Sequence, residues 1–176
     1  MTHKITLLAL FVIALSCTSF SQERETVAQT PAQPEENIFE TKNLWGVGGY
    51  GGLLSGIGLS ARFHPMGRIC VQLTGGALKL DELHYDFGLE GQFDFDTRGR
   101  SRFYGYVGMG YYYKEGKNAK GEKENALKAP LRLGLGIAYE WPVSEKLVFN
   151  LNGAFTYFTN GDILPLPQVG FYYYFN

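Results

Sequence analysis

Apolar and polar residues alternate along eight segments of about ten residues each. Residues 84–95 show the pattern best. Their odd-numbered positions are aromatic residues, leucine or glycine, and their even-numbered positions are acidic or amide residues, histidine or glycine. Successive side chains of a β-strand point to opposite faces, so this period of two predicts strands with one apolar face and one polar face.

The alternation predicts an all-β chain. We expect strands at 44–53, 57–64, 68–75, 84–95, 103–113, 131–141 and 147–158, and a last strand that ends at Phe175. Tight turns follow the second, fourth and sixth segments, and longer connections follow the third, fifth and seventh. Bacterial outer-membrane barrels alternate short periplasmic turns with longer external loops in this way. The sequence therefore predicts an eight-stranded antiparallel, transmembrane up-and-down β-barrel, in which only the connection near 54–56 is shorter than an external loop should be.

A soluble, lipocalin-like barrel has the same alternation but turns its apolar face inward. Two features oppose this alternative. Every lysine after residue 42 falls in a turn, a loop or a strand margin, and the polar face is rich in glycine, which suits a crowded lumen. Aromatic residues also gather near both ends of the predicted strands, like the girdles at the two membrane interfaces. We therefore expect the apolar face to contact lipid.

Residues 1–21 predict export from the cytoplasm. Lys4 supplies a positive charge, an apolar run follows, and small residues precede Gln22, where we expect the signal peptide to be cleaved. The apolar run is shorter than the about 20 residues that a spanning helix needs. A lipoprotein signal, with Cys17 as the acylated residue, is the alternative.

The mature chain contains two different kinds of segment. Residues 22–43 are rich in Glu, Gln and Thr and poor in apolar residues, so we expect a disordered periplasmic leader. The rest, 44–176, suits one barrel domain, for which monomer is the default state. Cys70 is the one cysteine left after cleavage, so an intramolecular disulfide is excluded and barrel closure has to supply the stability.

The charge balance argues against a nucleic-acid partner. The whole chain has a formal net charge of −1, which becomes −2 when Lys4 leaves with the signal. A nucleic-acid-binding domain would carry a strongly basic surface. We expect outer-membrane lipid and lipopolysaccharide as the surroundings of the barrel.

The chain as a whole resembles the small eight-stranded outer-membrane barrels, the family that includes the OmpA membrane domain and the OmpX-like proteins. Its last strand alternates aromatic residues over 171–175, which resembles the C-terminal signal read by the barrel-insertion machinery, although Asn176 follows the final phenylalanine. The signal ending at 19–22 resembles those of Bacteroidetes-type bacteria. The resemblance implies an outer-membrane location and an insertion partner, and it implies no specific activity.

The patterns that could carry chemistry are weak. Residues 46–51 match G-x-G-x-x-G, but that motif binds a dinucleotide only where it opens a helix, and another strand follows here. His64 and His84 are expected at opposite ends of the barrel, so they cannot share a metal ion. A lipid A-modifying enzyme would need a serine beside His84, where Asp86 stands. We expect no catalytic, cofactor-binding or metal-binding residue.

An ionic cluster is the most informative polar feature. By strand parity, Arg62, Asp94, Arg102 and Glu140 all face the lumen near its periplasmic end. Arg102 begins its strand between Asp94 and Glu140 on the two neighbouring strands. Isolated buried charges are costly, so we expect these four residues to pair.

Three further charges, Asp86, Glu90 and Arg132, face the lumen closer to its outer end. We expect Arg132 to meet Asp86 or Glu90 there. The whole set is either a structural plug or a gate that rearranges to open a pore. Eight strands enclose just enough space for side chains, which favours the plug.

The connection 114–128 is the expected contact surface. It has no periodicity, which predicts a solvated loop. Its net charge of +2 would attract the phosphates of lipopolysaccharide or another acidic partner. Its lysines are Lys114, Lys117, Lys120, Lys123 and Lys128.

The sequence favours a non-enzymatic structural or surface protein that acts in envelope integrity or adhesion through its external loops. A narrow channel or small-molecule conduit is the alternative. A soluble ligand binder and a lipid A-modifying enzyme rank below both.

Overall fold

The computed structural model describes residues 39, 43–65, 67–79, 82–117, 121 and 123–175. The expected signal peptide and most of the expected leader lie outside these residues. The strands are β1 (Leu44–Gly52), β2 (Gly56–His64), β3 (Ile69–Lys79), β4 (Leu83–Arg98), β5 (Ser101–Lys117), β6 (Lys123–Asn125), β7 (Leu131–Pro142), β8 (Leu147–Phe158) and β9 (Ile163–Phe175). The described residues include no helix that is long and apolar enough to cross a membrane.

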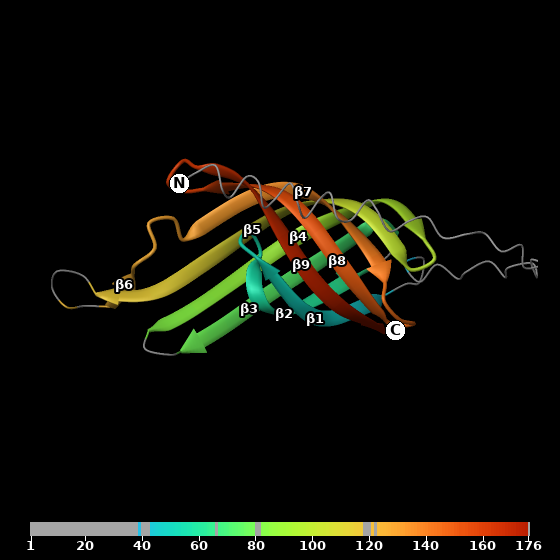
Figure 1. Cartoon of the computed structure of the whole chain (residues 1–176), viewed down its shortest axis with the longest axis horizontal. Coiled ribbons are helices and arrows are strands. Elements are labelled where there is room, and N and C mark those ends of the chain that lie inside the picture. Colours follow the sequence, from blue (N-terminus) through green and yellow to red (C-terminus); the bar gives the residue numbers. More distant parts are fainter. Residues whose placement is uncertain are drawn as a thin grey trace, which may run out of the picture. The chain divides into compact units, whose positions relative to one another are not determined.

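Eight of these strands form a closed antiparallel barrel (Figure 1). Their order around the wall is β1-β2-β3-β4-β5-β7-β8-β9, and β9 pairs with β1 to close it, with Trp45 opposite Phe175. This confirms the predicted eight-stranded up-and-down β-barrel. The short strand β6 pairs only with the far end of β5 in the described sheet.

The barrel has two unlike ends. At one end, which we call the terminal end, lie the start of β1, the end of β9 and the short turns β2–β3, β4–β5 and β7–β8. At the other, the loop end, the β5–β6 hairpin extends beyond the wall, on the left of Figure 1. Of the connections that the sequence predicted to be longer, only the one that follows β5 is long. The connections 80–82 and 159–162 are as short as the turns at the terminal end, because the strands continue further than the alternation suggested.

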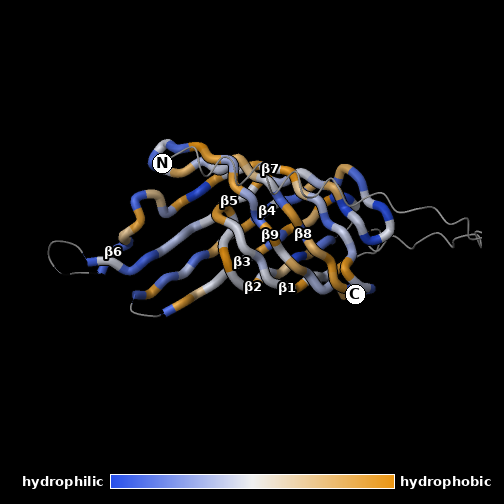
Figure 2. Tube along the Cα trace, in the orientation of Figure 1, coloured by the Kyte–Doolittle hydropathy of each residue, from blue (hydrophilic) through white to orange (hydrophobic). Residues whose placement is uncertain are grey.

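The two faces of the wall differ as the period of two requires. Outward side chains are apolar: Leu135, for example, is 60% exposed. Inward side chains are mostly polar or aromatic with a hydroxyl, and Arg62, Arg102 and Glu140 are completely buried. Figure 2 shows the resulting alternation of hydrophobic and hydrophilic positions along the strands, with hydrophilic residues gathered at the turns. The polar face thus forms the core.

The connection 114–128 is more ordered than the sequence analysis expected. β5 continues to Lys117, and Glu115 pairs with Asn125 on β6, so much of this segment is a hairpin. Lys and Glu occupy both faces of this hairpin, so solvent reaches both, and no apolar period marks the strands. Lys120 lies outside the described residues.

Candidate functional site

The lumen holds the predicted ionic cluster near the terminal end. Arg102 lies 3.2 Å from Asp94 through Nη1 and 3.2 Å from Glu140 through Nε. Arg62 forms an ion pair with the other carboxylate oxygen of Glu140. All four side chains are at most 1% exposed. Strand pairing explains the geometry, because Arg102 on β5 stands directly opposite Glu140 on β7.

Neutral partners complete the shell of the two arginines. Arg62 donates to Gln72 Oε1 at 2.6 Å and to the Tyr104 hydroxyl at 3.1 Å, and its guanidinium lies 3.5 Å from the centre of the Tyr172 ring. Arg102 donates to Gln92 Oε1 at 2.6 Å. Buried arginines with hydrogen bonds, carboxylates and ring faces around them are compensated for the loss of water. The cluster therefore forms a buried polar layer across the barrel.

A second polar layer lies closer to the loop end. The Tyr50 hydroxyl donates to Glu90 at 3.0 Å, and Gln92 Nε2 donates to the other Glu90 oxygen at 2.9 Å. Asn152 on β8 donates to the Tyr50 hydroxyl at 2.7 Å. Glu90 is thus hydrogen-bonded and does not form an ion pair with Arg132. The sequence had predicted either Glu90 or Asp86 as the partner of that arginine.

The turn between β1 and β2 folds into the lumen and covers this layer. Leu54 and Ser55 are completely buried. Their backbone N–H groups both donate to Gln168 Oε1 on β9, at 3.3 Å. Tyr112 on β5 accepts from Gly56 N at 2.9 Å and donates to Gly52 O at 2.8 Å. The short connection that did not fit an external loop is thus an internal plug, which we call the plug turn (residues 53–55).

Arg132 and Asp86 hold the plug turn instead of pairing with each other. Arg132 Nη1 donates to Leu53 O at 2.7 Å, and its guanidinium stacks 3.6 Å from the centre of the Tyr112 ring. Asp86 Oδ1 accepts from Ile57 N at 2.8 Å. Arg132 and Asp86 interact electrostatically, as expected, but not as a direct ion pair, because the backbone of the inserted turn supplies a closer partner to each charge.

Glycines on the opposite wall make room for the plug turn. The carbonyl of Leu54 lies against Gly110, and the carbonyl of Ser55 lies against Gly88, so closely that a Cβ at either glycine would overlap it. A Cβ at Gly134 would meet the Leu54 side chain at 2.9 Å. The inward glycines therefore have a specific role, namely the close approach of another backbone.

Phe39 occupies the terminal end of the lumen. It is 3% exposed, and its ring lies 5.5 Å from His64, 5.5 Å from Tyr174 and 5.5 Å from the guanidinium of Arg102. The expectation of a disordered leader over 22–43 is therefore wrong at this residue, because an aromatic ring here covers the ionic cluster. Phe39 thus covers the lumen at one end and Leu54 covers it at the other, and a hollow of about 520 Å³ lies beside Phe39 and Asp94 at the terminal end.

The lysines of the β5–β6 hairpin are partly paired. Lys114 lies 3.2 Å from Glu82, and Lys123 lies 2.7 Å from Glu115. The hydrogen bond from Lys123 lowers the pKa of the Glu115 carboxyl below its ordinary value of 4.5, and Glu115 in turn raises the pKa of Lys123. Lys117 and Lys128 are exposed. This pairing reduces the basic charge that the hairpin presents.

The described residues contain no group of three His, Cys, Asp or Glu side chains arranged to hold a metal ion. His64 is buried beside Arg102, with Nε2 at 3.2 Å from Nη1, and His84 is exposed at the start of β4. Cys70 is a buried free thiol that fills space in the lumen. These groups pack the barrel or its rim.

Comparison with family models, with curated proteins and with solved structures gives no match for this chain. The class that the geometry defines is an eight-stranded closed antiparallel β-barrel with a polar, filled lumen.

Proposed function

We propose that this chain is an outer-membrane β-barrel protein related in architecture to the OmpA and OmpX type. The observation that carries the proposal is the inversion of the two faces: large apolar side chains cover the outside, and charged side chains fill the inside. A soluble barrel would turn the apolar face inward, and soluble monomers rarely expose apolar patches beyond a few hundred Å². A lipid bilayer is the solvent that suits such an exterior.

Aromatic contacts at both ends of the outer face support the same proposal. At the terminal end Trp141 contacts Phe149, and Phe149 contacts Phe171, each pair with ring centres 4.7 Å apart. Towards the loop end Tyr85 stacks on Tyr113, also at 4.7 Å. Amphipathic rings favour the boundary between headgroups and acyl chains, so two such groups fit the two interfaces of one membrane.

We further propose that the protein is a non-conducting structural or surface component. The filled lumen, with Phe39 at one end and the plug turn at the other, supports this role over that of a channel. The β5–β6 hairpin projects beyond the wall and would be the part that contacts lipopolysaccharide or another cell-surface partner.

Cell fractionation, followed by gel mobility of the membrane fraction with and without boiling, tests the location. A closed barrel should survive detergent, so the unboiled band should migrate differently from the boiled band. A soluble periplasmic protein without this shift would overturn the proposal in favour of a ligand-binding barrel. Bilayer recordings test the second part: discrete conductance steps from the unmodified protein would make it a channel.

A further inference from the structure

The plug turn leaves a notch in the barrel wall at the loop end. β2 pairs with β3 only as far as Leu59 opposite Gly75, although β3 continues to Lys79 along β4. β1 pairs with β9 only as far as Gly51 opposite Val169, although β9 begins at Ile163 along β8. In the described sheet, the outer parts of β3 and β9 therefore have a paired strand on one side only, although the backbone of Ile57 on β2 still lies close to Gly76 on β3.

Backbone features fit this break in the wall. Gly58, where β2 turns away, has a φ of 153°, which an L-residue with a side chain rarely adopts. On the other side of the notch, β9 carries Pro165 and Pro167, which have no N–H group to leave unpaired. Proline on an edge strand is a common protection of a sheet edge. The two prolines therefore protect the edge of β9 that has no paired strand.

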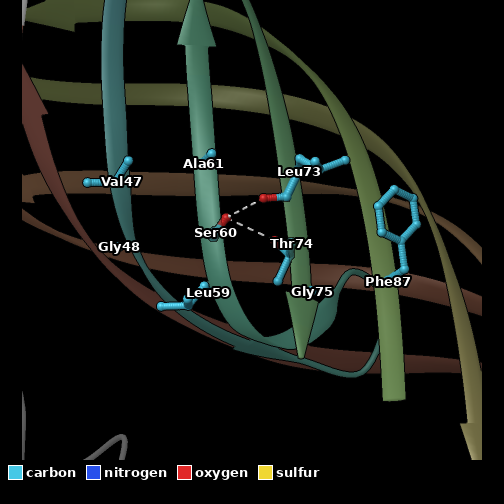
Figure 3. Close-up of a pocket in the computed structure, with 9 residues that line it drawn as sticks. All are labelled: Val47, Gly48, Leu59, Ser60, Ala61, Leu73, Thr74, Gly75 and Phe87. Atoms are coloured by element: carbon cyan, nitrogen blue, oxygen red, sulfur yellow. Dashed lines mark hydrogen bonds between the residues drawn. The ribbon is translucent and has the colours of Figure 1, made fainter. Parts of the chain in front are cut away.

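A hollow in the outer face lies where β2 leaves β3. Its volume is about 480 Å³. Gly75 stands between Leu59 on β2 and Phe87 on β4, so the missing side chain leaves a space between two large ones (Figure 3). Small Ala61 borders the same space. The lining is almost entirely apolar, and the shape suits a flexible hydrocarbon chain.

A positive charge lies on the same face of β3. Gly75, Ala77 and Lys79 have the same parity, and four residues of extended strand place Lys79 about 14 Å beyond Gly75 towards the loop end. Lys79 is exposed. An apolar hollow with a cation further towards the membrane surface complements a lipid that carries a phosphate above its acyl chains.

We propose that the hollow binds the lipid A part of a lipopolysaccharide molecule, with one acyl chain between Leu59 and Phe87 and a phosphate near Lys79. This inference rests on the proposed membrane location. The acyl chain would cover the outward side of the inserted β1–β2 hairpin, and the lysine would select for phosphate.

Native mass spectrometry of the folded protein in detergent, titrated with purified lipid A, tests the hollow. Gly75→Phe fills it, and a Cβ at this position meets only the Asp86 carbonyl, at 3.6 Å. Gly153→Phe is the matched control, because Gly153 is an outward glycine on β8 with open space around it. We expect one lipid per wild-type barrel. Gly75→Phe should weaken the affinity for lipid A about tenfold, because about two methylenes of the acyl chain would no longer be buried in the hollow. The control should keep the wild-type affinity.

A second pair of variants tests the phosphate contact. Lys79→Gln should weaken binding of lipid A but leave binding of dephosphorylated lipid A unchanged, whereas Lys146→Gln, in the turn at the terminal end, should affect neither. Equal affinities of Gly75→Phe and Gly153→Phe, or no stoichiometric lipid on the wild type, would overturn the inference. Every variant is first run on a gel with and without boiling, so a failure of the barrel or of its membrane location is recognised separately.

Discussion

The backbone carbonyl of Leu54 lies against Gly110 on the opposite wall of the barrel, in the space that a Cβ atom at that glycine would occupy. The contact joins the tip of the first hairpin to a strand that is not its neighbour in the sheet. It follows that the position of the plug turn depends on the absence of a side chain at Gly110.

Gly110→Val should therefore displace the plug turn from the lumen. The measurement is the reaction rate of Ser55→Cys with a water-soluble thiol reagent in a Cys70→Ser background. Ser55 is completely buried, so the new thiol should be unreactive in the protein that keeps Gly110. It should react with the reagent in the Gly110→Val protein. Gly153→Val, which adds the same side chain to open space, should leave the thiol protected. A protected thiol in the Gly110→Val protein would show that the turn tolerates the extra side chain.

Arg102→Met should strongly destabilise the barrel. It leaves Asp94 and part of the Glu140 carboxylate buried without a cation, which typically costs about 3–5 kcal/mol. Urea unfolding in detergent, followed by the gel shift, measures the change in the free energy of unfolding. Arg98→Met removes an exposed arginine from its ion pair with Asp96, 3.0 Å away, and should cost less than about 1 kcal/mol.

The double variant Arg102→Met with Asp94→Leu separates charge from packing. Removing the stranded carboxylate together with the arginine should recover part of the lost stability. If the loss of unfolding free energy in the double variant equals the sum of the losses in the two single variants, the destabilisation comes from lost packing. The ion pair would then contribute no coupling energy of its own.

Phe39→Ala should open the terminal end of the lumen. In a chain that begins at Gln22, Cys70 is the only thiol, and it is completely buried beside Arg102, whose guanidinium lies 5.5 Å from the Phe39 ring. We expect faster labelling of Cys70 by a small water-soluble reagent in the folded protein. Phe171→Ala removes an outward ring from β9 and should leave the labelling rate unchanged.

Leu135→Arg tests the assignment of the two faces. Leu135 is 60% exposed in the middle of β7, and an arginine at the bilayer midplane costs about 2–4 kcal/mol. Folding yield into lipid vesicles should fall accordingly, whereas Leu135→Ala should fold well. Unimpaired folding of Leu135→Arg would mean that this face does not meet lipid.

The pair of Glu115 and Lys123 should give the β5–β6 hairpin a modest pH dependence. The pKa of Glu115 is lowered in the folded hairpin, so its contribution is present above pH 4.5 and is lost as the pH falls through the lowered value. The pKa of Lys123 is raised, so its contribution is lost only at strongly alkaline pH. NMR titration of the Glu115 carboxyl should show a pKa below 4.5 that rises in Lys123→Gln, while the Leu83 N–H and Lys79 keep part of the lowering.

Much of the fold could be predicted from the sequence because alternation, turn residues and strand number are local signals. The position of Arg102 between Asp94 and Glu140 also follows from strand parity and tight turns, which fix the register of neighbouring strands.

Contacts across the lumen could not be predicted in the same way. The plug turn meets strands that are distant in the sheet, and no periodicity reports such a contact. Two signals could have suggested it: the connection near 54–56 is short, and glycines face inward on the opposite strands, as at Gly88 and Gly110. Phe39 is one aromatic residue in a segment of polar composition, and an average over that segment conceals it.

The hydrogen bonds of the plug turn have a consequence for assembly. Gln168, which accepts from both N–H groups of the turn, belongs to β9, which follows the other barrel strands in the chain and closes the wall against β1. The first hairpin therefore cannot reach its final state until the last strand is in register. If β1 and β9 paired in the wrong register, Leu54 N and Ser55 N would be buried without an acceptor, which is energetically costly. The plug turn therefore favours the correct register of the two closing strands.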